Sequence, residues 1–267
     1  MPSQRHDQGR NRSNSVRRAL MLLEAVADAN QAGDEPLASQ LACQLEMNRS
    51  TALRLLQPLV DHNLVEQENG AGGYRLGPAV VRLGQAYLEK MEVRRAAGPY
   101  LRSLRDLSHE TVHLGIKDDL EVVYVDKVES LLPVRMYSVI GARQPLYCTA
   151  MGKAHLAHAP ESVFRAVVDR GLVARTANTI VSAASLRQSI AEIRDRGFAV
   201  DDIENEPDIR CVAAPIFDHL GGVVAMVSIS GPATRMTPDR VAELGPEVRD
   251  ATRAISHLLG YQGASVP

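Results

Sequence analysis

The sequence predicts an α+β protein made of two parts that follow one another along the chain. Up to about residue 77, apolar residues at helical spacing are followed by two short strand-like stretches around a glycine-rich tip. Beyond about residue 94, strand-like and helical stretches are mixed without strict alternation, which favours an antiparallel sheet. The 267 residues, 45% of them hydrophobic and 23% charged, suffice for two domains with their own cores.

The composition also excludes several classes of protein. No run of about 18 apolar residues is present, so we expect no membrane helix. The basic, polar start lacks the apolar segment of a secretory signal, which makes the cytoplasm the expected location. Three cysteines, Cys43, Cys148 and Cys211, lie far apart in the sequence, which argues against a disulfide scaffold and a zinc finger.

The first part begins with residues 1–14, whose polar composition predicts a disordered arm. From Ser15 a helix is expected, because apolar residues then recur at helical spacing, at Val16, Leu20, Leu23 and Val26. Further helices are predicted over residues 37–45 and 49–62, the latter with Asn48 as its N-cap. The stretches LVEQE and YRL around the glycines then form a hairpin, so residues 15–77 have the order of a winged helix-turn-helix.

The third of these helices has the composition of a DNA-reading element. Base edges in the major groove would be contacted by the polar face of its first turns, which holds Arg49, Ser50, Thr51 and Arg54. Arg75 beside the hairpin tip and Arg17 in the first helix would contact the DNA backbone. A three-helix bundle with a solvated polar face is the alternative. Residues 1–75 hold eight basic and nine acidic side chains, so a single copy should bind DNA weakly.

A linker helix is predicted over residues 78–93, and a second domain over residues 94–262. Its expected helices cover residues 95–108, 150–159, 162–170 and 238–259, and another around 186–193 that Gly197 terminates. Its expected strands cover residues 111–116, 121–128, 134–139, 197–202, 210–217 and 221–230.

The stretch His109-Glu110-Thr111-Val112-His113 matches the H-E-x-x-H pattern of zinc hydrolases. That chemistry needs both histidines on one face of a helix, whereas apolar residues alternate here with a period of two, as on a strand. Cys211, which follows the acidic stretch DDIENE, could be a nucleophile, and the acidic stretch a metal site. A buried structural thiol and a solvated connection are favoured, because no histidine stands at an informative spacing.

Residues 145–154, PLYCTAMGKA, contain a Gly-Lys pair but lack the first glycine and the Ser or Thr of a P-loop. Thr149 is suited to cap a helix that begins at Ala150. The backbone N–H groups of Ala150 and Met151 would then be free to hold a small anion. An ordinary capped helix without a ligand remains the alternative.

The chain resembles the IclR-type bacterial transcriptional regulators (the isocitrate lyase regulator family) over about residues 15–262. The resemblance is carried by SVRRALMLLEAV, NRSTALRLLQPLV, GGYRLGPAVVRLG, GARQPLYCTAMGKA, RGFAVDDIENEPDIRCVAAPIFD and VSISGPATRMT. It implies a winged helix-turn-helix joined by the linker helix to a GAF-like effector-binding domain. It also implies dimers that assemble into tetramers on operator DNA.

The resemblance further implies a site for a small carboxylate effector. The positions that match the family's pocket are Met136, Ala150, Met151, Asp201, Ile209 and Cys211. An aspartate beside a bound carboxylate would repel it, so we expect Asp201 to accept a hydrogen bond from a ligand hydroxyl, hydrate or bridging water.

Three residues depart from the family pattern. Glu46 replaces a glycine in the helix-turn, which predicts some backbone strain. Pro58 lies inside the predicted DNA-reading helix and predicts a bend after Arg54. Asp208 replaces a glycine before the Arg-Cys strand, which predicts an altered pocket rim.

These observations together predict a DNA-binding transcriptional regulator, such as a repressor, whose operator binding is modulated by a small organic acid. We expect no catalytic residue, metal or cofactor. Two alternatives stay open at this point. One is a zinc-dependent hydrolase that uses His109, Glu110 and His113. The other is a ligand sensor that acts through protein partners.

Overall fold

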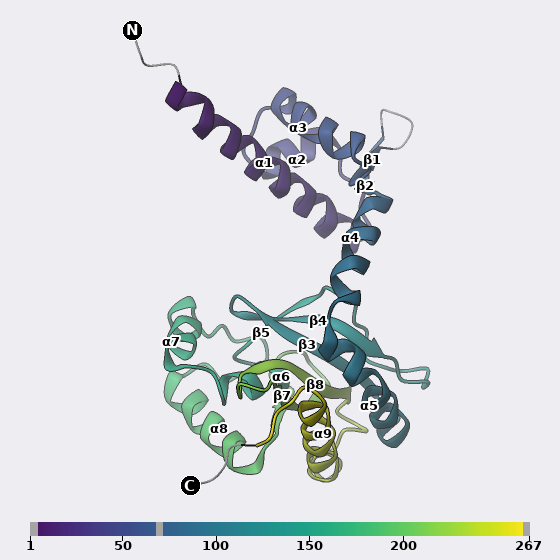
Figure 1. The fold of residues 1–267 in the computed structure, drawn as a ribbon, viewed down its shortest axis with the longest axis vertical. Helices are drawn as coiled ribbons and strands as arrows, with labels where there is room; N and C mark the ends of the chain where they lie inside the picture. The colour runs from purple at the N-terminus through teal and green to yellow at the C-terminus, as the bar shows by residue number, and fades with distance from the viewer. Residues whose placement is uncertain (1–4, 68–71, 264–267) are drawn as a thin grey trace. The chain divides into compact units, whose positions relative to one another are not determined.

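The computed structural model describes residues 5–67 and 72–263. The chain divides into two compact units, residues 1–90 and residues 91–267. The first unit consists, in order, of α1 (Arg5–Gln31), α2 (Ala38–Gln44), α3 (Arg49–Asp61), β1 (Val65–Gln67), β2 (Tyr74–Leu76) and α4 (Pro78–Glu89) (Figure 1). β1 and β2 pair antiparallel, so the predicted helix-turn-helix with its hairpin is confirmed.

One apolar core holds the first unit together. Its fully buried members come from every element up to the hairpin and include Leu22, Leu41, Leu56, Val65 and Tyr74. On α3 the buried positions are Ala52, Leu55, Leu56 and Leu59. The opposite face of α3 is therefore left for solvent or a partner.

The predicted disordered arm differs from the structure, because α1 begins at Arg5. A formed helix is extended one residue at a time at little cost, so a polar stretch can continue it. Residues 1–4 lie outside the described residues. Asn48 occupies the N-cap position of α3, but its side chain makes no capping hydrogen bond.

The inward face of α1 also differs from the prediction. Val16 and Leu20 are 61% and 52% exposed, whereas Leu22, Ala25 and Val26 are buried. The spacing of apolar residues was compatible with more than one stripe, and the core selects the stripe that faces α2 and α3.

The second unit consists of α5 (Glu92–Ser108), β3 (Thr111–Asp118), β4 (Glu121–Val128), β5 (Arg143–Pro145), α6 (Ala150–Leu156), α7 (Glu161–Arg170), α8 (Ala183–Arg196), β6 (Ala199–Asp202), β7 (Ile209–Phe217), β8 (Val223–Pro232) and α9 (Pro238–Leu258). Within the described residues the strands form one six-stranded antiparallel sheet in the order β5-β4-β3-β8-β7-β6. This confirms the predicted α+β antiparallel domain.

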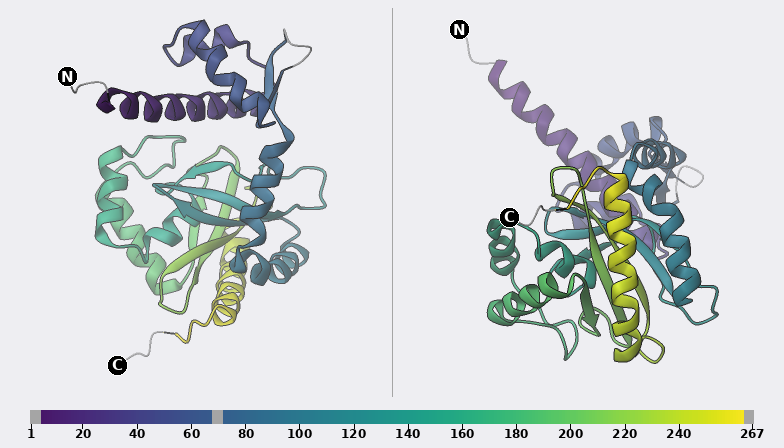
Figure 2. Two further views of the ribbon diagram at one scale, coloured as in Figure 1. Left: turned by 45° about the horizontal axis from the view of Figure 1, so that its top comes forward. Right: turned by 60° about the horizontal axis from the view of Figure 1, so that its bottom comes forward.

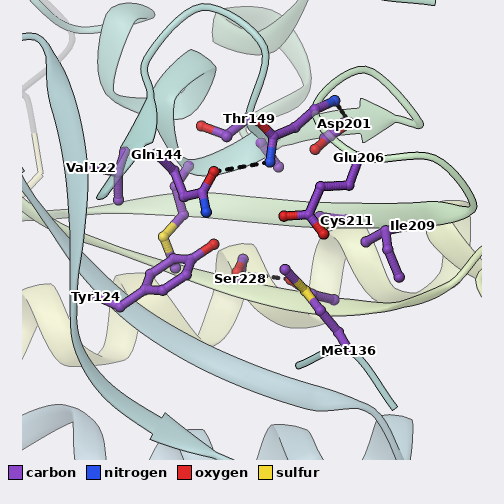
Figure 3. Close-up of a pocket in the computed structure, with 14 residues that line it drawn as sticks. Val122, Tyr124, Met136, Gln144, Thr149, Asp201, Glu206, Ile209, Cys211 and Ser228 are labelled. Carbon is purple, nitrogen blue, oxygen red and sulfur yellow. Dashed lines mark hydrogen bonds between the residues drawn. The ribbon is translucent and has the colours of Figure 1, made fainter. Parts of the chain in front are cut away.

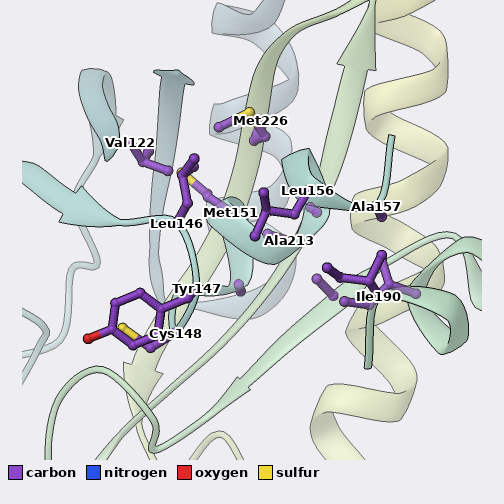
Figure 4. Packing of buried hydrophobic residues seen from close by; sticks show 14 of the residues in the cluster. Val122, Leu146, Tyr147, Cys148, Met151, Leu156, Ala157, Ile190, Ala213 and Met226 are labelled. Atoms are coloured by element: carbon purple, nitrogen blue, oxygen red, sulfur yellow. The ribbon is translucent and has the colours of Figure 1, made fainter. Parts of the chain in front are cut away.

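Helices cover both faces of this sheet (Figure 2). α5 and α9 pack on one face, while α6 packs on the other and α8 packs against α6. Side chains alternate between the two faces of the sheet along β7. Cys211 and Ala213 join the core on the side of α6 to α8, where Figure 4 labels Ala213, and Val212 and Ala214 are fully buried on the opposite side. The sheet is thus a central layer, and the polar residues on its α6 face are enclosed.

The second unit confirms one predicted detail, the end of α8, and contradicts another, the strand over residues 134–139. Gly197 ends α8 with φ of +82°, as predicted for a C-cap. The predicted strand over residues 134–139 is wrong, because this segment joins no ladder. Buried and more exposed side chains nonetheless alternate in this segment, since Met136 and Ser138 are buried and the side chains next to them are not.

Two residues that stand in place of glycine adopt left-handed backbone conformations. Glu46 has φ of +48° and Asp208 has φ of +60°. An L-residue pays for this conformation because its Cβ approaches the following carbonyl oxygen. The strain predicted at Glu46 therefore has a structural basis in the turn between α2 and α3.

Candidate functional site

A row of polar side chains crosses the sheet on its α6 face. Asp201 on β6 is paired in register with Cys211 on β7, and Cys211 is paired with Ser230 on β8. Directly paired residues on neighbouring strands share a face. The same holds for the next row, in which Ser228 of β8 lies between Ala213 and His113.

Helix α6 begins directly above this face. The Thr149 hydroxyl accepts a hydrogen bond from the Gly152 amide at 3.0 Å, so Thr149 is the N-cap that the sequence predicted. Among the described residues, no protein acceptor is bonded to the backbone N–H of Ala150 or Met151. Gly115 allows the close approach, because a Cβ there would lie 2.7 Å from Met151 Sδ.

The start of α6 and the polar rows border a narrow pocket that is partly open to solvent and has a free volume of about 10 Å³ (Figure 3). All six positions implied by the resemblance line it, namely Met136, Ala150, Met151, Asp201, Ile209 and Cys211. They come from three distant stretches of sequence, and only the folded sheet brings them together.

Burial determines the charge state of the pocket's acidic groups. Burial raises the pKa of Asp201 to about 7, even though the Glu204 and Asn205 amides donate hydrogen bonds to its Oδ1 at 2.7 and 3.3 Å. Burial likewise raises the pKa of the Cys211 thiol well above its ordinary value. Cys211 is therefore a protonated, buried thiol, as the sequence favoured, and lacks the activation that a thiol nucleophile needs.

The Gly152-Lys153 pair serves packing and not phosphate binding. A Cβ on Gly152 would lie 2.2 Å from the Leu146 carbonyl oxygen, so glycine is required where α6 meets the preceding strand segment. Lys153 is buried and forms an ion pair with Glu204. Its ammonium group therefore already has a partner below the pocket.

Sequence reasoning missed part of the pocket lining. The remaining lining residues are Val122, Tyr124, Gln144, Thr149, Asn205, Glu206, Ser228 and Ser230. Thr149 was predicted as a cap but not as a pocket residue. Asn205 and Glu206 belong to the acidic stretch DDIENE, which the sequence suggested as a metal site and not as part of a pocket. The others carry no motif, and alternation along β8 placed its serines on one face without showing what that face encloses.

The H-E-x-x-H pattern is not a metal site. His109 ends α5 with φ of +62°, and His113 lies on β3, as the period of two predicted. Glu110 pairs with Arg235 at 2.5 Å. No cluster of three or more potential metal ligands occurs among the described residues. The zinc-hydrolase alternative therefore loses its geometric basis.

The predicted DNA-contacting residues lie on the surface of the first unit. Arg49, Ser50 and Arg54 are exposed at the start of α3, and Thr51 is half-buried. In the described part of the chain, neither Arg49 nor Arg54 forms an ion pair.

Two further arginines predicted to contact DNA lie in surroundings that the sequence did not predict. Arg75 is exposed but its Nε pairs with Glu66 across the hairpin at 3.1 Å. Arg17 is exposed but lies inside α1, because the helix begins earlier than predicted.

Across residues 5–67 and 72–263, no helix combines the length and the apolar character that a membrane span requires. A helix-turn-helix unit followed by an α+β unit with a buried polar pocket defines the class of helix-turn-helix transcriptional regulators. Residues 15–69 match the IclR helix-turn-helix domain, and residues 85–257 match the C-terminal domain of bacterial IclR transcriptional regulators. The chain belongs to the IclR family, and it is a DNA-binding transcriptional regulator and not an enzyme.

Similar proteins extend over nearly the whole chain. The transcriptional repressor AllR of Klebsiella pneumoniae is 33% identical over 262 residues, which cover 98% of this chain and 95% of AllR. The regulator KdgR of Escherichia coli K12 is 34% identical over 248 residues, covering 92% of this chain and 93% of KdgR. The crystal structure of Thermotoga maritima IclR has a TM-score of 0.74 and 34% identity, covering 93% of this chain and all of that one.

Proposed function

We propose that a small organic acid binds in the pocket of the second unit and changes the affinity of this regulator for operator DNA. The supporting observation is the convergence of six positions from three sequence stretches around two amides that lack a protein acceptor. Free N–H groups at the positive end of a helix favour a carboxylate. With a pKa of about 7, Asp201 is partly neutral near neutral pH, which weakens its repulsion of that carboxylate.

The effector site is tested by thermal unfolding in the presence of small carboxylic acids. A ligand that binds only the folded state raises the melting temperature. We expect at least one acid to raise it for the wild type, and Asp201→Ala to reduce that shift. Asp169→Ala, which changes an exposed aspartate on α7, should leave the shift intact. A panel in which no acid stabilises the wild type would refute the proposed effector site.

We propose that Arg49, Ser50, Thr51 and Arg54 contact base edges, and that Arg17 and Arg75 contact phosphates. Arg49 and Arg54 are supported as readers because both are exposed on α3 and form no ion pair within the described residues. Each of Arg49→Ala and Arg54→Ala should cost about 1–3 kcal/mol in specific operator binding. Arg102→Ala, on an exposed position of the second unit, is the matched control.

Gel-shift titration at several salt concentrations against the chain's own upstream region measures this effect. Unchanged binding and salt dependence in both arginine variants would contradict the assigned face. That result would favour a sensor that acts through protein partners.

We also propose an oligomeric state, a cellular location and the direction in which this protein changes transcription. We propose a homodimer or tetramer, because the first unit carries more acidic than basic residues up to position 75 and a single copy would bind DNA weakly. We propose a cytoplasmic location, because operator DNA would be bound there. The similarity to the repressor AllR supports repression. Light scattering of the purified protein measures the oligomeric state. A promoter fusion, compared with and without the gene, shows whether the protein represses transcription.

A further inference from the structure

Three polar side chains line the pocket without a role in the carboxylate capture proposed above. They are Tyr124 on β4, Gln144 on β5 and Glu206 in the segment before β7. Figure 3 shows all three directed into the pocket. Their hydrogen-bonding capacities determine which second group a ligand needs.

A chain of hydrogen bonds fixes the orientation of Gln144. Burial raises the pKa of the Cys148 thiol to about 12, so this thiol keeps its proton. It donates to Asn205 Oδ1 at 3.5 Å, which leaves Asn205 Nδ2 to donate to Gln144 Oε1 at 3.1 Å. The Gln144 oxygen is thereby occupied, and its Nε2 is the atom presented to the pocket (Figure 3). Gln144 therefore offers a hydrogen-bond donor.

Glu206 offers the complementary acceptor. Its side chain is half-buried, and within the described residues its carboxylate has no hydrogen-bond or ion-pair partner. Burial raises its pKa, and the nearby charge of Arg175 counteracts only part of that rise. A partly desolvated carboxylate without a partner gains from a ligand that donates a hydrogen bond to it.

Tyr124 is the most enclosed of the three, with 7% of its surface exposed. Its ring stacks on His113 with centroids 4.6 Å apart, which holds the phenol in place. No described residue is hydrogen-bonded to its hydroxyl. Its oxygen is not cut off from solvent, so a ligand or a water molecule can hydrogen-bond to it.

We propose that Gln144 and Glu206, together with Tyr124, form a polar subsite that selects acids carrying a second hydroxyl group farther from the carboxylate than the α-carbon. A hydroxyl can accept from Gln144 Nε2 and donate to Glu206 at the same time. A methyl group would leave both unpaired, a second carboxylate would be repelled by Glu206, and an ammonium group has no lone pair for Gln144. This inference rests on the proposed carboxylate site at Ala150 and Met151.

The test uses lactate and glycerate, which differ by one hydroxyl group on the terminal carbon. Isothermal titration of the full chain with DL-lactate and DL-glycerate gives the ratio of their dissociation constants. We expect the wild type to bind glycerate about tenfold more tightly, the gain of one or two good hydrogen bonds. Gln144→Leu and Glu206→Ala should each bring the ratio close to one. Glu247→Ala, at an exposed position of α9, should keep the wild-type ratio.

The ratio of the two dissociation constants distinguishes loss of this subsite from general damage to the pocket, because such damage weakens the binding of both acids alike. Removing Glu206 also removes a negative charge, so lactate should bind no worse to Glu206→Ala than to the wild type. Equal binding of lactate and glycerate to the wild type would overturn the hydroxyl subsite and leave the carboxylate site standing. No binding of either acid to any variant would contradict the carboxylate site itself, and this inference with it.

Discussion

At the scale of single residues, burial decides how the charged groups around the pocket behave. Asp201 is 3% exposed, and Lys153 and Glu204 are 2% and 5% exposed. The Lys153 ammonium compensates Glu204, whereas Asp201 has only backbone donors. The two carboxylates therefore respond differently to mutation and to pH.

Loss of Lys153 should strongly destabilise the protein. In Lys153→Met the Glu204 charge stays buried without a partner, which is expected to cost about 3–5 kcal/mol in the free energy of unfolding. Lys153→Met combined with Glu204→Leu should recover most of that loss, because no isolated charge remains. Urea unfolding measures both, and Arg187→Met, which breaks an exposed pair with Glu161, should have a smaller effect. A double variant as unstable as the single one would contradict this account.

Asp201 should make stability fall as pH rises from about 4 to about 7. Burial raises its pKa to about 7, so the folded protein binds its proton more tightly than the unfolded chain does. Asp201→Asn cannot ionise, and we expect it to be more stable relative to the wild type at pH 8 than at pH 5. Urea midpoints at the two pH values measure this difference. Asp169→Asn should show the same difference at both, and a pH-independent result for Asp201→Asn would refute the raised pKa.

At the scale of elements, the position of α6 depends on glycines that permit close approach. Gly115 leaves room for Met151, and Gly152 lies against Leu146. These two contacts set the height of the free amides above the sheet. Helix α6 is short, with seven residues from Ala150 to Leu156, so packing and not helix propensity holds it in place.

Gly152→Ala should therefore destabilise the second unit and weaken acid binding. Its Cβ would lie 2.2 Å from the Leu146 carbonyl oxygen, and the resulting shift should cost about 1–3 kcal/mol. Gly98→Ala in α5 is a matched control, because its nearest neighbour would be a flexible arginine tip at 3.7 Å. That control should be neutral or stabilising by about 0.5–1 kcal/mol. Thermal unfolding and calorimetric titration compare the two, and equal effects would contradict the role of Gly152.

Periodicity and capping residues predicted most elements, because both depend on neighbours along the chain. The period of two at residues 111–116 and the terminating Gly197 are examples. The buried face of α1 could not be predicted, because the spacing of its apolar residues was compatible with more than one face. Packing in the core determines which of them is buried. Tyr124 and Gln144 were not predicted as pocket residues for a related reason, and Asn205 was considered only as part of the acidic stretch DDIENE. They come from separate segments and acquire a common role only when the sheet register is formed.

At the scale of the whole molecule, charge balance and division into units bear on DNA binding. The chain carries a net charge of −2, and its first 75 residues are not basic overall. Phosphate contacts supply much of the affinity for DNA, and the proposed dimer or tetramer would supply affinity that a single copy lacks. The chain also divides into two compact units, residues 1–90 and residues 91–267.

The first unit alone should bind operator DNA much more weakly than the full chain. A fragment of residues 1–90 keeps α3 with its arginines but lacks the second unit. If copies associate through the full chain, the fragment should lose at least about tenfold in affinity at equal salt. Fluorescence anisotropy with labelled operator measures both. Equal affinity of fragment and full chain would contradict the need for assembly beyond the first unit.

The polar row across β6, β7 and β8 has a further consequence for biosynthesis. Asp201, Cys211 and Ser230 become neighbours only after the last strand has joined the sheet, and that strand is followed in the chain by α9 alone among the described elements. A nascent chain therefore has no complete polar row until β8 has been synthesised and has paired with β7. Responsiveness to a metabolite would then require that β6, β7 and β8 are paired in their native register.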